Sequence, residues 1–160
     1  MSGIFKNDQN FFLVEKKWLK ILKEQVEKSP KKMSRLLLHL NAEDKVQEML
    51  IAFNKKTLIS PNKSLNKSES LLIIEGKVLL ILFDNDGKIK NKIIMQNDGD
   101  DQSVFMYRIN KGEWHTMKAL SKEVIVYEIL EGPFTNSSEE KPKWMPKDQK
   151  ELKNFIDKIN

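Results

Sequence analysis

The stretch that decides the fold is KTLISPNKSLNKSESLLIIEG, which runs from Lys56 to Gly76. It begins with extended residues, passes through a polar turn around Pro61 and continues into a strongly apolar strand. This order is typical of a β-barrel motif in which a strand end presents side chains to the interior. A second stretch, RINKGEWHT from Arg108 to Thr116, is its companion. Together the two stretches predict an architecture and a pocket, but no particular reaction.

The composition is that of a soluble globular protein. The chain has 160 residues, of which 39% are hydrophobic and 32% are charged, enough for one domain with a proper core. No apolar run approaches the roughly 18–20 residues that span a bilayer, and the N-terminus has no signal-peptide pattern. The absence of cysteine excludes disulfides and thiolate metal sites. We therefore expect a cytoplasmic protein that does not engage a membrane.

The positive charge of the chain is concentrated at its two ends. The net charge is +5 for residues 1–35, +3 for residues 141–160 and −3 for the residues between them. A nucleic-acid-binding module usually gathers its basic residues on one face, often interleaved with aromatic residues. Here the lysines alternate mostly with acidic residues on faces that the pattern predicts to be solvated. We therefore expect no nucleic-acid partner.

Hydrophobic periodicity predicts helices at the two ends of the chain. Apolar residues at three- and four-residue spacing predict an amphipathic helix over 11–28, which ends before Pro30 because the residue preceding proline avoids helical geometry. The basic stretch that follows is either a solvated linker or a segment from which Arg35 reaches an anionic ligand. A second amphipathic helix is predicted over 148–159.

Between the helices the pattern predicts many short strands. They fall at 46–53, 71–74, 78–83, 89–95, 103–109, 117–120 and 124–130. Turns rich in Gly, Asn and Asp separate them, including a tight turn at 75–77, which predicts an all-β barrel or sandwich rather than alternating βα units. The expected organisation is an N-terminal helix and basic linker over 1–35, a β-barrel over 36–134, and a C-terminal tail and helix over 135–160.

Two motifs of defined spacing relate the predicted barrel to a known family. The first conserved motif of cupins is Gly, five residues, His-x-His, three or four residues, Glu, six residues, Gly. With every spacing kept, its positions fall on Lys56, Asn62, Ser64, Glu69 and Gly76. The second motif, Pro-x-Gly-x-x-His, falls on Asn110, Gly112 and His115.

From about Ser29 the chain also resembles the WbuC family of cupin-fold metalloproteins, in matched order over about two-thirds of its length. The matching segments are Ser29-Pro30-Lys31-Lys32, Leu38-His39, Val46-Gln47-x-Met49-Leu50-Ile51-Ala52, Pro61, Leu79 to Asp84, Gly112-x-Trp114-His115-Thr116 and Glu131-Gly132-Pro133-Phe134. The resemblance implies a single-domain, mainly β cupin (a double-stranded β-helix or jelly-roll barrel) with a helix at each end. It further implies a pocket for a sugar or sugar nucleotide, a link to surface-polysaccharide biosynthesis, and a homodimer, since cupins often pair through their sheets.

The metal site that the resemblance implies is incomplete in this chain. A typical cupin holds a divalent metal with both His of the first motif, its Glu, and the His of the second. Here Asn62 and Ser64 replace the His pair, so that Glu69 and His115 alone remain. Imidazole is a good transition-metal ligand, whereas a neutral hydroxyl is a poor one. We therefore expect no tightly bound cofactor; a retained divalent metal would use Glu69 and His115, with Asn62 as a third ligand.

Without a metal, two interpretations of Glu69 and His115 remain. They are either remnants that line a ligand pocket, or a general acid–base pair comparable to that of metal-free, cupin-like epimerases of nucleotide-linked sugars. Strand alternation makes Tyr107 and Arg108 further pocket candidates, one of which should face inward. It also predicts that the Trp114 side chain points away from that of His115. The alternatives to a sugar-nucleotide protein are a non-catalytic cupin that binds a carbohydrate or an acidic ligand and, as the weaker one, a metal-dependent isomerase or oxygenase.

Overall fold

The computed structural model describes residues 3–135 and 139–159. Over these residues most of the regular structure is β-strand, as the pattern predicted. The elements are β1 (Ile4–Lys6), α1 (Lys17–Lys28), β2 (Met33–Leu37), β3 (Val46–Asn54), β4 (Lys63–Ser64), β5 (Glu69–Glu75), β6 (Lys77–Phe83), β7 (Ile89–Gln96), β8 (Met106–Ile109), β9 (Trp114–Ala119), β10 (Glu123–Glu131), β11 (Glu139–Glu140) and α2 (Gln149–Asp157).

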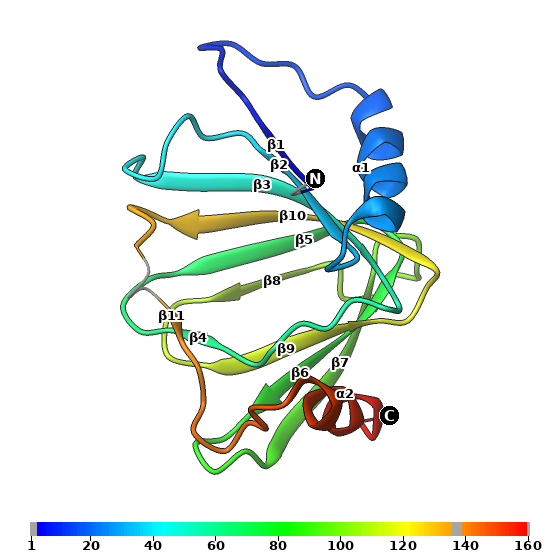
Figure 1. Ribbon diagram of the computed structural model, residues 1–160, viewed down its shortest axis with the longest axis vertical. Helices are drawn as coiled ribbons and strands as arrows, with labels where there is room; N and C mark the ends of the chain where they lie inside the picture. Colours follow the sequence, from blue (N-terminus) through cyan, green and yellow to red (C-terminus); the bar gives the residue numbers. More distant parts are fainter. Residues whose placement is uncertain (1–2, 136–138, 160) are drawn as a thin grey trace.

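The strands form two facing sheets and a short ribbon (Figure 1). The larger sheet has the order β1-β2-β3-β10-β5-β8, and the smaller one has the order β7-β6-β9. All of these pairings are antiparallel except that of β1 with β2, and β4 pairs with β11 beside them. Sequence neighbours such as β5 and β6 lie in different sheets, so the chain crosses repeatedly between the two layers, which builds one domain.

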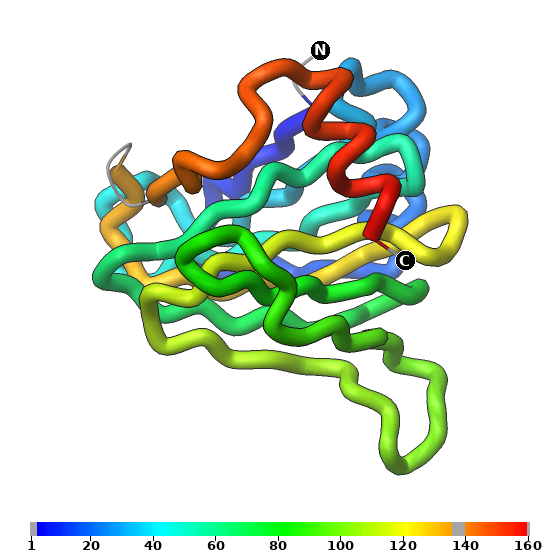
Figure 2. Tube along the Cα trace, turned by 90° about the horizontal axis from the view of Figure 1, so that it is seen from below, coloured from blue at the N-terminus to red at the C-terminus, as the bar shows by residue number. Residues whose placement is uncertain are grey.

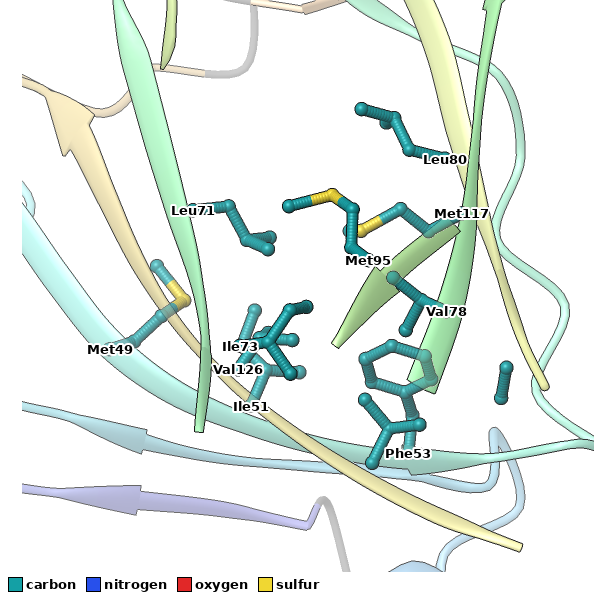
Figure 3. Packing of buried hydrophobic residues seen from close by; sticks show 12 residues of the cluster. Met49, Ile51, Phe53, Leu71, Ile73, Val78, Leu80, Met95, Met117 and Val126 are labelled. Carbon is teal, nitrogen blue, oxygen red and sulfur yellow. The ribbon is translucent and has the colours of Figure 1, made fainter. Parts of the chain in front are cut away.

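The main core fills the space between the two sheets. Figure 3 shows side chains of β3, β5 and β10 pointing toward those of β6, β7 and β9. The residues at its centre are fully or almost fully buried: Ile51, Phe53, Leu71, Ile73, Val78, Leu80, Met95 and Val126. Full burial of one such side chain stabilises the fold by roughly 1.5–3 kcal/mol, so this interior holds the two layers together.

The two helices cover the outer faces of the sheets. On the larger sheet, Leu22 and Val26 of α1 pack in one cluster with Leu50 and Ile125. On the smaller sheet, α2 packs against outward-facing residues of β6 and β9, with the cluster formed by Leu79, Ile81, Phe83, Trp114, Leu152 and Ile156. Because β3 and β6 are buried on both faces, they read as continuous apolar runs rather than as alternating ones. Neither helix in the described ranges is long and apolar enough to cross a membrane.

Three predicted elements differ from the structure. The first helix begins at Lys17 rather than at residue 11, and the apolar residues Phe11, Leu13 and Val14 before it are 76%, 66% and 42% exposed, so they do not extend its buried face. The predicted strand over 103–109 begins only at Met106, since the connection after β7 projects away from the rest of the molecule (Figure 2). The short strand predicted over 117–120 is longer and starts at Trp114.

The basic stretch after the first helix is not a solvated linker. Lys31 and Lys32 lie in a turn, but Arg35 belongs to β2, which pairs with β3 on one side and with β1 on the other. Met33, Arg35 and Leu37 share one face of β2, opposite Phe53, Ile51 and Met49 of the core strand β3. The proposed division after residue 35 therefore falls inside a strand of the larger sheet, and β2 aims Arg35 at the interior.

The turn predicted at 75–77 is a crossing between sheets rather than a hairpin. Gly76 has φ +87°, a left-handed conformation that disfavours side chains. A Cβ atom at Gly76 would lie 2.3 Å from the carbonyl oxygen of Glu123. Gly112, in the second motif, also has a positive φ of +74°, but a Cβ atom there would meet nothing within 4 Å. Gly76 is therefore required by both backbone conformation and space, and Gly112 by conformation alone.

We expect Gly76→Ala to destabilise the protein more than Gly112→Ala. Gly112→Ala is the control and should lower the free energy of unfolding by about 1–2 kcal/mol, the usual cost of an alanine in the left-handed conformation. Gly76→Ala adds a steric clash to that cost, so it should at least double the loss. Urea unfolding of both variants measures the difference, and equal losses would contradict this account of the crossing.

Candidate functional site

An inner cavity of about 160 Å³ lies between the two sheets. Its apolar wall comes from core residues such as Ile51, Phe53 and Val126. The polar groups that line it are Asn62, Glu69 and His115 of the two motifs, together with Arg35 and Glu128. Residues from distant parts of the sequence therefore meet in one interior space.

The contact at the centre of the site is an ion pair between Glu69 and His115. Glu69 opens β5 of the larger sheet and His115 lies in β9 of the smaller one, so the contact joins the two layers. Glu69 Oε1 lies 2.9 Å from His115 Nε2, and each side chain is only 7% exposed. The backbone of Asn62 pairs with that of His115 through two N–H···O bonds of 3.1 and 3.0 Å, which holds the first motif beside the second.

Two further groups complete a hydrogen-bonded chain. The Tyr107 hydroxyl donates to Glu69 Oε1 at 2.8 Å. His115 Nδ1 lies 3.0 Å from the carbonyl oxygen of Glu113, which can only accept. Nδ1 therefore carries a proton, and Nε2 donates its own proton to the Glu69 carboxylate when the ring is charged.

The pKa values support a charged pair. Burial works to raise the pKa of Glu69, but the hydrogen bond and charge of His115, together with the Tyr107 hydroxyl, leave it below its ordinary value. Burial likewise works to lower the pKa of His115, but the bond and charge of Glu69, the Glu113 carbonyl and the charge of Glu128 leave it raised. Burial, followed by the charges of Glu69 and Glu128, holds the pKa of Tyr107 well above its ordinary value. These directions favour a carboxylate on Glu69, an imidazolium on His115 and a neutral phenol on Tyr107.

Glu128 is a site residue that the sequence interpretation missed. It lies in β10, where its partners are Met49 of β3 and Leu71 of β5. Its charge acts on both His115 and Tyr107. The signal was present, because Glu128 falls two residues from the inward-facing Val126 in a strand of period 2.

A second, more open groove of about 470 Å³ adjoins the inner cavity. Arg35, Glu128 and Leu130 line both spaces. The outer groove also receives Lys6 from β1 and His39 from the segment after β2. Arg35, a candidate from the sequence, therefore stands at the junction of the two spaces.

Three predicted pocket residues are not among those that line the inner cavity. Tyr107 faces inward but contacts the site through Glu69. Ser64 is buried in β4 but is not among the residues that line the inner cavity. Arg108 is exposed, and it donates to Ser70 Oγ and to Asn110 Oδ1, each at 3.2 Å. Strand alternation explains this, because Tyr107 takes the inward face of β8 and leaves Arg108 the outward one. By the same alternation Trp114 packs against the α2 side, away from His115.

The donor set does not fit a tightly held transition metal. Within residues 3–135 and 139–159, no three His, Cys, Asp or Glu side chains form a group that could hold a metal ion. The two firm ligand types, Glu69 and His115, already bond to each other. The Asn62 side chain bonds to the carbonyl of Ser60 at 3.4 Å, and an amide is a weak third partner for such a metal.

The stabilisation from the central pair should depend on pH in both directions. The contribution of Glu69 is present above the ordinary carboxyl pKa of 4.5 and is lost as pH falls through its lowered folded value. That of His115 is present below the ordinary imidazole pKa of 6.5 and is lost as pH rises through its raised folded value. Glu69→Gln should therefore cost most, about 3–5 kcal/mol, between pH 4.5 and 6.5, as measured by urea unfolding across the pH range.

Glu113→Gln is the matched control for that experiment. Glu113 pairs with Lys90 at the same distance of 2.9 Å, but both side chains are 43% exposed. An exposed pair contributes about 0–1 kcal/mol, so this variant should show a small and nearly flat effect. A pH-independent loss in Glu69→Gln would argue against the charged pair.

Protein purified without added metal is expected to contain less than stoichiometric Fe, Mn, Ni or Zn, as measured by elemental mass spectrometry. Asn62→His restores an imidazole at a cavity-lining position and supplies a third firm ligand, so it should raise zinc uptake. A full equivalent of any of these metals in the unmodified protein would refute the expectation.

Comparisons with known proteins agree with this fold. Protein SO0799 from Shewanella oneidensis matches with a TM-score of 0.52 and 8% identity, over 61% of this chain and 62% of that one. Oxalate oxidase in complex with the substrate analogue glycolate matches with a TM-score of 0.50 and 11% identity, over 66% of this chain and 54% of that one. CapF with the inhibitor 3-isopropenyl-tropolone matches with a TM-score of 0.53 and 14% identity, over 68% of this chain and 30% of that one. The chain thus spans less than two thirds of each of these proteins, and at such identities the likeness shows the fold alone.

A comparison with curated proteins finds no significant match. The cupin-fold neighbours confirm the predicted single-domain, cupin-like β fold. A family model described as a domain of unknown function, DUF6016, matches residues 14–95, just over half of the chain. Those residues include α1 and β2 to β6, and they carry Asn62 and Glu69 of the site. The chain therefore belongs to the DUF6016 family.

Proposed function

We propose that this protein binds a small polar ligand, a sugar or sugar nucleotide, with Glu69 and His115 at the inner end of the site and Tyr107 hydrogen-bonded to Glu69 behind them. The observation that carries the proposal is that the buried ion pair lines a cavity instead of being packed on all sides. Ligand sites typically combine apolar walls with a few convergent polar groups, and ionisable groups with shifted pKa values concentrate at such sites.

The polar groups suit hydroxyl-rich ligands. The Glu69 carboxylate accepts from Tyr107 and faces His115, and a carboxylate has about four lone-pair sites, so acceptor capacity remains. The Asn62 amide offers both a donor and an acceptor. Apolar residues such as Phe53 and Ile51 supply the surface against which the C–H face of a sugar ring would pack.

The dimensions favour a ligand that extends beyond the inner cavity. The inner space, about 160 Å³, is smaller than the roughly 300–1,000 Å³ of ordinary small-molecule sites. The adjoining groove of about 470 Å³ lies within that range. A ligand of two parts, such as a sugar joined to a nucleotide, matches two connected spaces.

The hydrogen bonds and pKa values of Glu69 and His115 favour ligand binding over catalytic turnover. A general base near neutral pH needs a free lone pair and a matched pKa. Both nitrogens of His115 are engaged, so its ring offers no free lone pair while the pair is intact, and the lowered pKa of Glu69 makes its carboxylate a weak base. Epimerisation of a keto sugar by this pair is the second candidate, supported by the Tyr107–Glu69–His115 chain.

The biological setting is part of the same proposal. The resemblance to the WbuC family supports a role in surface-polysaccharide biosynthesis. The alternative is a non-catalytic protein that binds a carbohydrate or an acidic ligand, for which Arg35 at the junction of the two spaces is the charged partner. A metal-dependent isomerase or oxygenase is the weakest candidate, because the donor set fits a metal poorly.

We expect calorimetric titration with UDP-glucose, UDP-N-acetylglucosamine and dTDP-glucose to detect binding of at least one of them. Glu69→Gln, His115→Asn and Tyr107→Phe should each weaken that binding about tenfold or more, since a hydrogen bond to a charged group contributes about 1.5–3 kcal/mol. His115→Asn should also abolish any turnover of a keto sugar, and retained turnover would exclude a catalytic role for His115.

Tyr127→Phe is the matched control for Tyr107→Phe. The chain has two tyrosines, and Tyr127 likewise donates to a carboxylate, that of Glu48, but it packs in the cluster on the α1 side of the sheet. Its substitution should leave the affinity unchanged. The proposal fails if none of the three probes binds, or if all three site variants bind like the unmodified protein.

A further inference from the structure

The outer groove presents an unusual set of hydrogen-bond donors. Arg35, Lys6 and His39 all line it, and they come from β2, β1 and the segment that follows β2. We propose that this groove is an anion subsite, which holds the phosphate or pyrophosphate of the ligand whose sugar enters the inner cavity. The inference rests on the proposed function and adds to it the orientation of the ligand.

Arg35 is the central residue of this subsite. Its backbone is held by β3 on one side and β1 on the other, and its side chain is partly buried at the junction of the two spaces. Its guanidinium has no ion pair or side-chain hydrogen bond to any residue in the described ranges. A charge taken partly out of water calls for a partner, and a guanidinium matches a phosphate with two parallel hydrogen bonds.

His39 and Lys6 extend the same donor surface. His39 Nδ1 lies 3.0 Å from the carbonyl oxygen of Glu48 and 3.1 Å from its backbone nitrogen, so Glu48 holds the ring through Nδ1. When Nδ1 accepts from the Glu48 N–H, Nε2–H is the donor that meets a ligand. Lys6 pairs in register with Leu37, two residues beyond Arg35 on the same face of β2. Lys6 is exposed, and no contact of its ammonium group is found in the part of the chain that the structure describes. The three donors therefore lie on adjacent segments around one groove.

One acidic group of the site lies inside and the other lies at the junction. Glu69 lines the inner cavity but not the outer groove, whereas Glu128 lines both spaces, as Arg35 does, and its charge acts on His115 and Tyr107. Two carboxylates disfavour a phosphate in the inner space but accept bonds from sugar hydroxyls. The charge distribution thus orients a two-part ligand, with its hydroxyl-rich part inside and its anionic part outside.

Pyrophosphate and inorganic phosphate are the probes that test the subsite on the full chain. Calorimetry should show binding of pyrophosphate that weakens with added salt, as an exposed ionic contact requires. Nuclear magnetic resonance should show shifts in the side-chain signals of His39. Arg35→Met, which keeps the length of the side chain, should weaken pyrophosphate binding at least about tenfold, equivalent to ~1.4 kcal/mol.

Two further variants separate charge from structure. Arg35→Lys retains the charge and should recover part of the lost affinity. Lys122→Ala removes the same charge as Lys6→Ala, but Lys122 is an exposed residue just before β10, at the end of that strand opposite Glu128 and Leu130. Lys6→Ala should weaken binding several-fold and Lys122→Ala should not change it. Circular dichroism melts establish that each variant is folded.

The outcomes distinguish this inference from the proposed function. Absence of pyrophosphate binding, or equal affinities in Arg35→Met and Lys122→Ala, overturns the anion subsite even if a sugar nucleotide binds and perturbs His115. Binding of pyrophosphate that is lost in Arg35→Met supports the subsite even if every sugar nucleotide leaves the His115 signals unchanged, a result that would refute only the proposed function.

Discussion

The buried contact between Glu69 and His115 ties the two layers of this protein together. Glu69 belongs to the larger sheet and His115 to the smaller one, and their side chains meet at 2.9 Å in the interior. Burying two charges is costly unless each is paired and hydrogen-bonded, and here Tyr107 and the Glu113 carbonyl supply the remaining bonds. The position of the strands, the charge state of the pair and the shape of the cavity therefore depend on one another.

Around this contact, the charged groups are distributed unevenly between the two spaces. Glu69 lines only the inner cavity and Lys6 and His39 line only the outer groove, whereas Arg35 and Glu128 line both. Such a gradient gives a ligand a preferred direction, because hydroxyl groups and phosphates favour opposite ends. The same residues on a packed core would only stabilise the fold; beside two connected spaces they form a binding site.

The exchange of the first-motif histidines changes what this barrel can do. With imidazoles at residues 62 and 64, the resemblance would imply a metal centre. With Asn62 lining the cavity and Ser64 buried beside it, the imidazole of His115 instead pairs with a carboxylate, which raises its pKa. An imidazolium donates hydrogen bonds and no longer offers a lone pair to a metal.

The sequence by itself determined the alternation of strands and turns, the spacing of the two motifs, the direction of Trp114 away from His115, and that either Tyr107 or Arg108 faces inward, because these depend on local periodicity. Only the tertiary structure decided that the basic stretch at Arg35 is a strand and that Glu128 joins the site. Both depend on pairing with β3, which follows β2 directly in the chain but lies far from β10 in sequence, and such tertiary pairing overrides local preference. The position of Arg35 at the junction of the two spaces, which carries the proposed orientation of the ligand, follows from that same pairing.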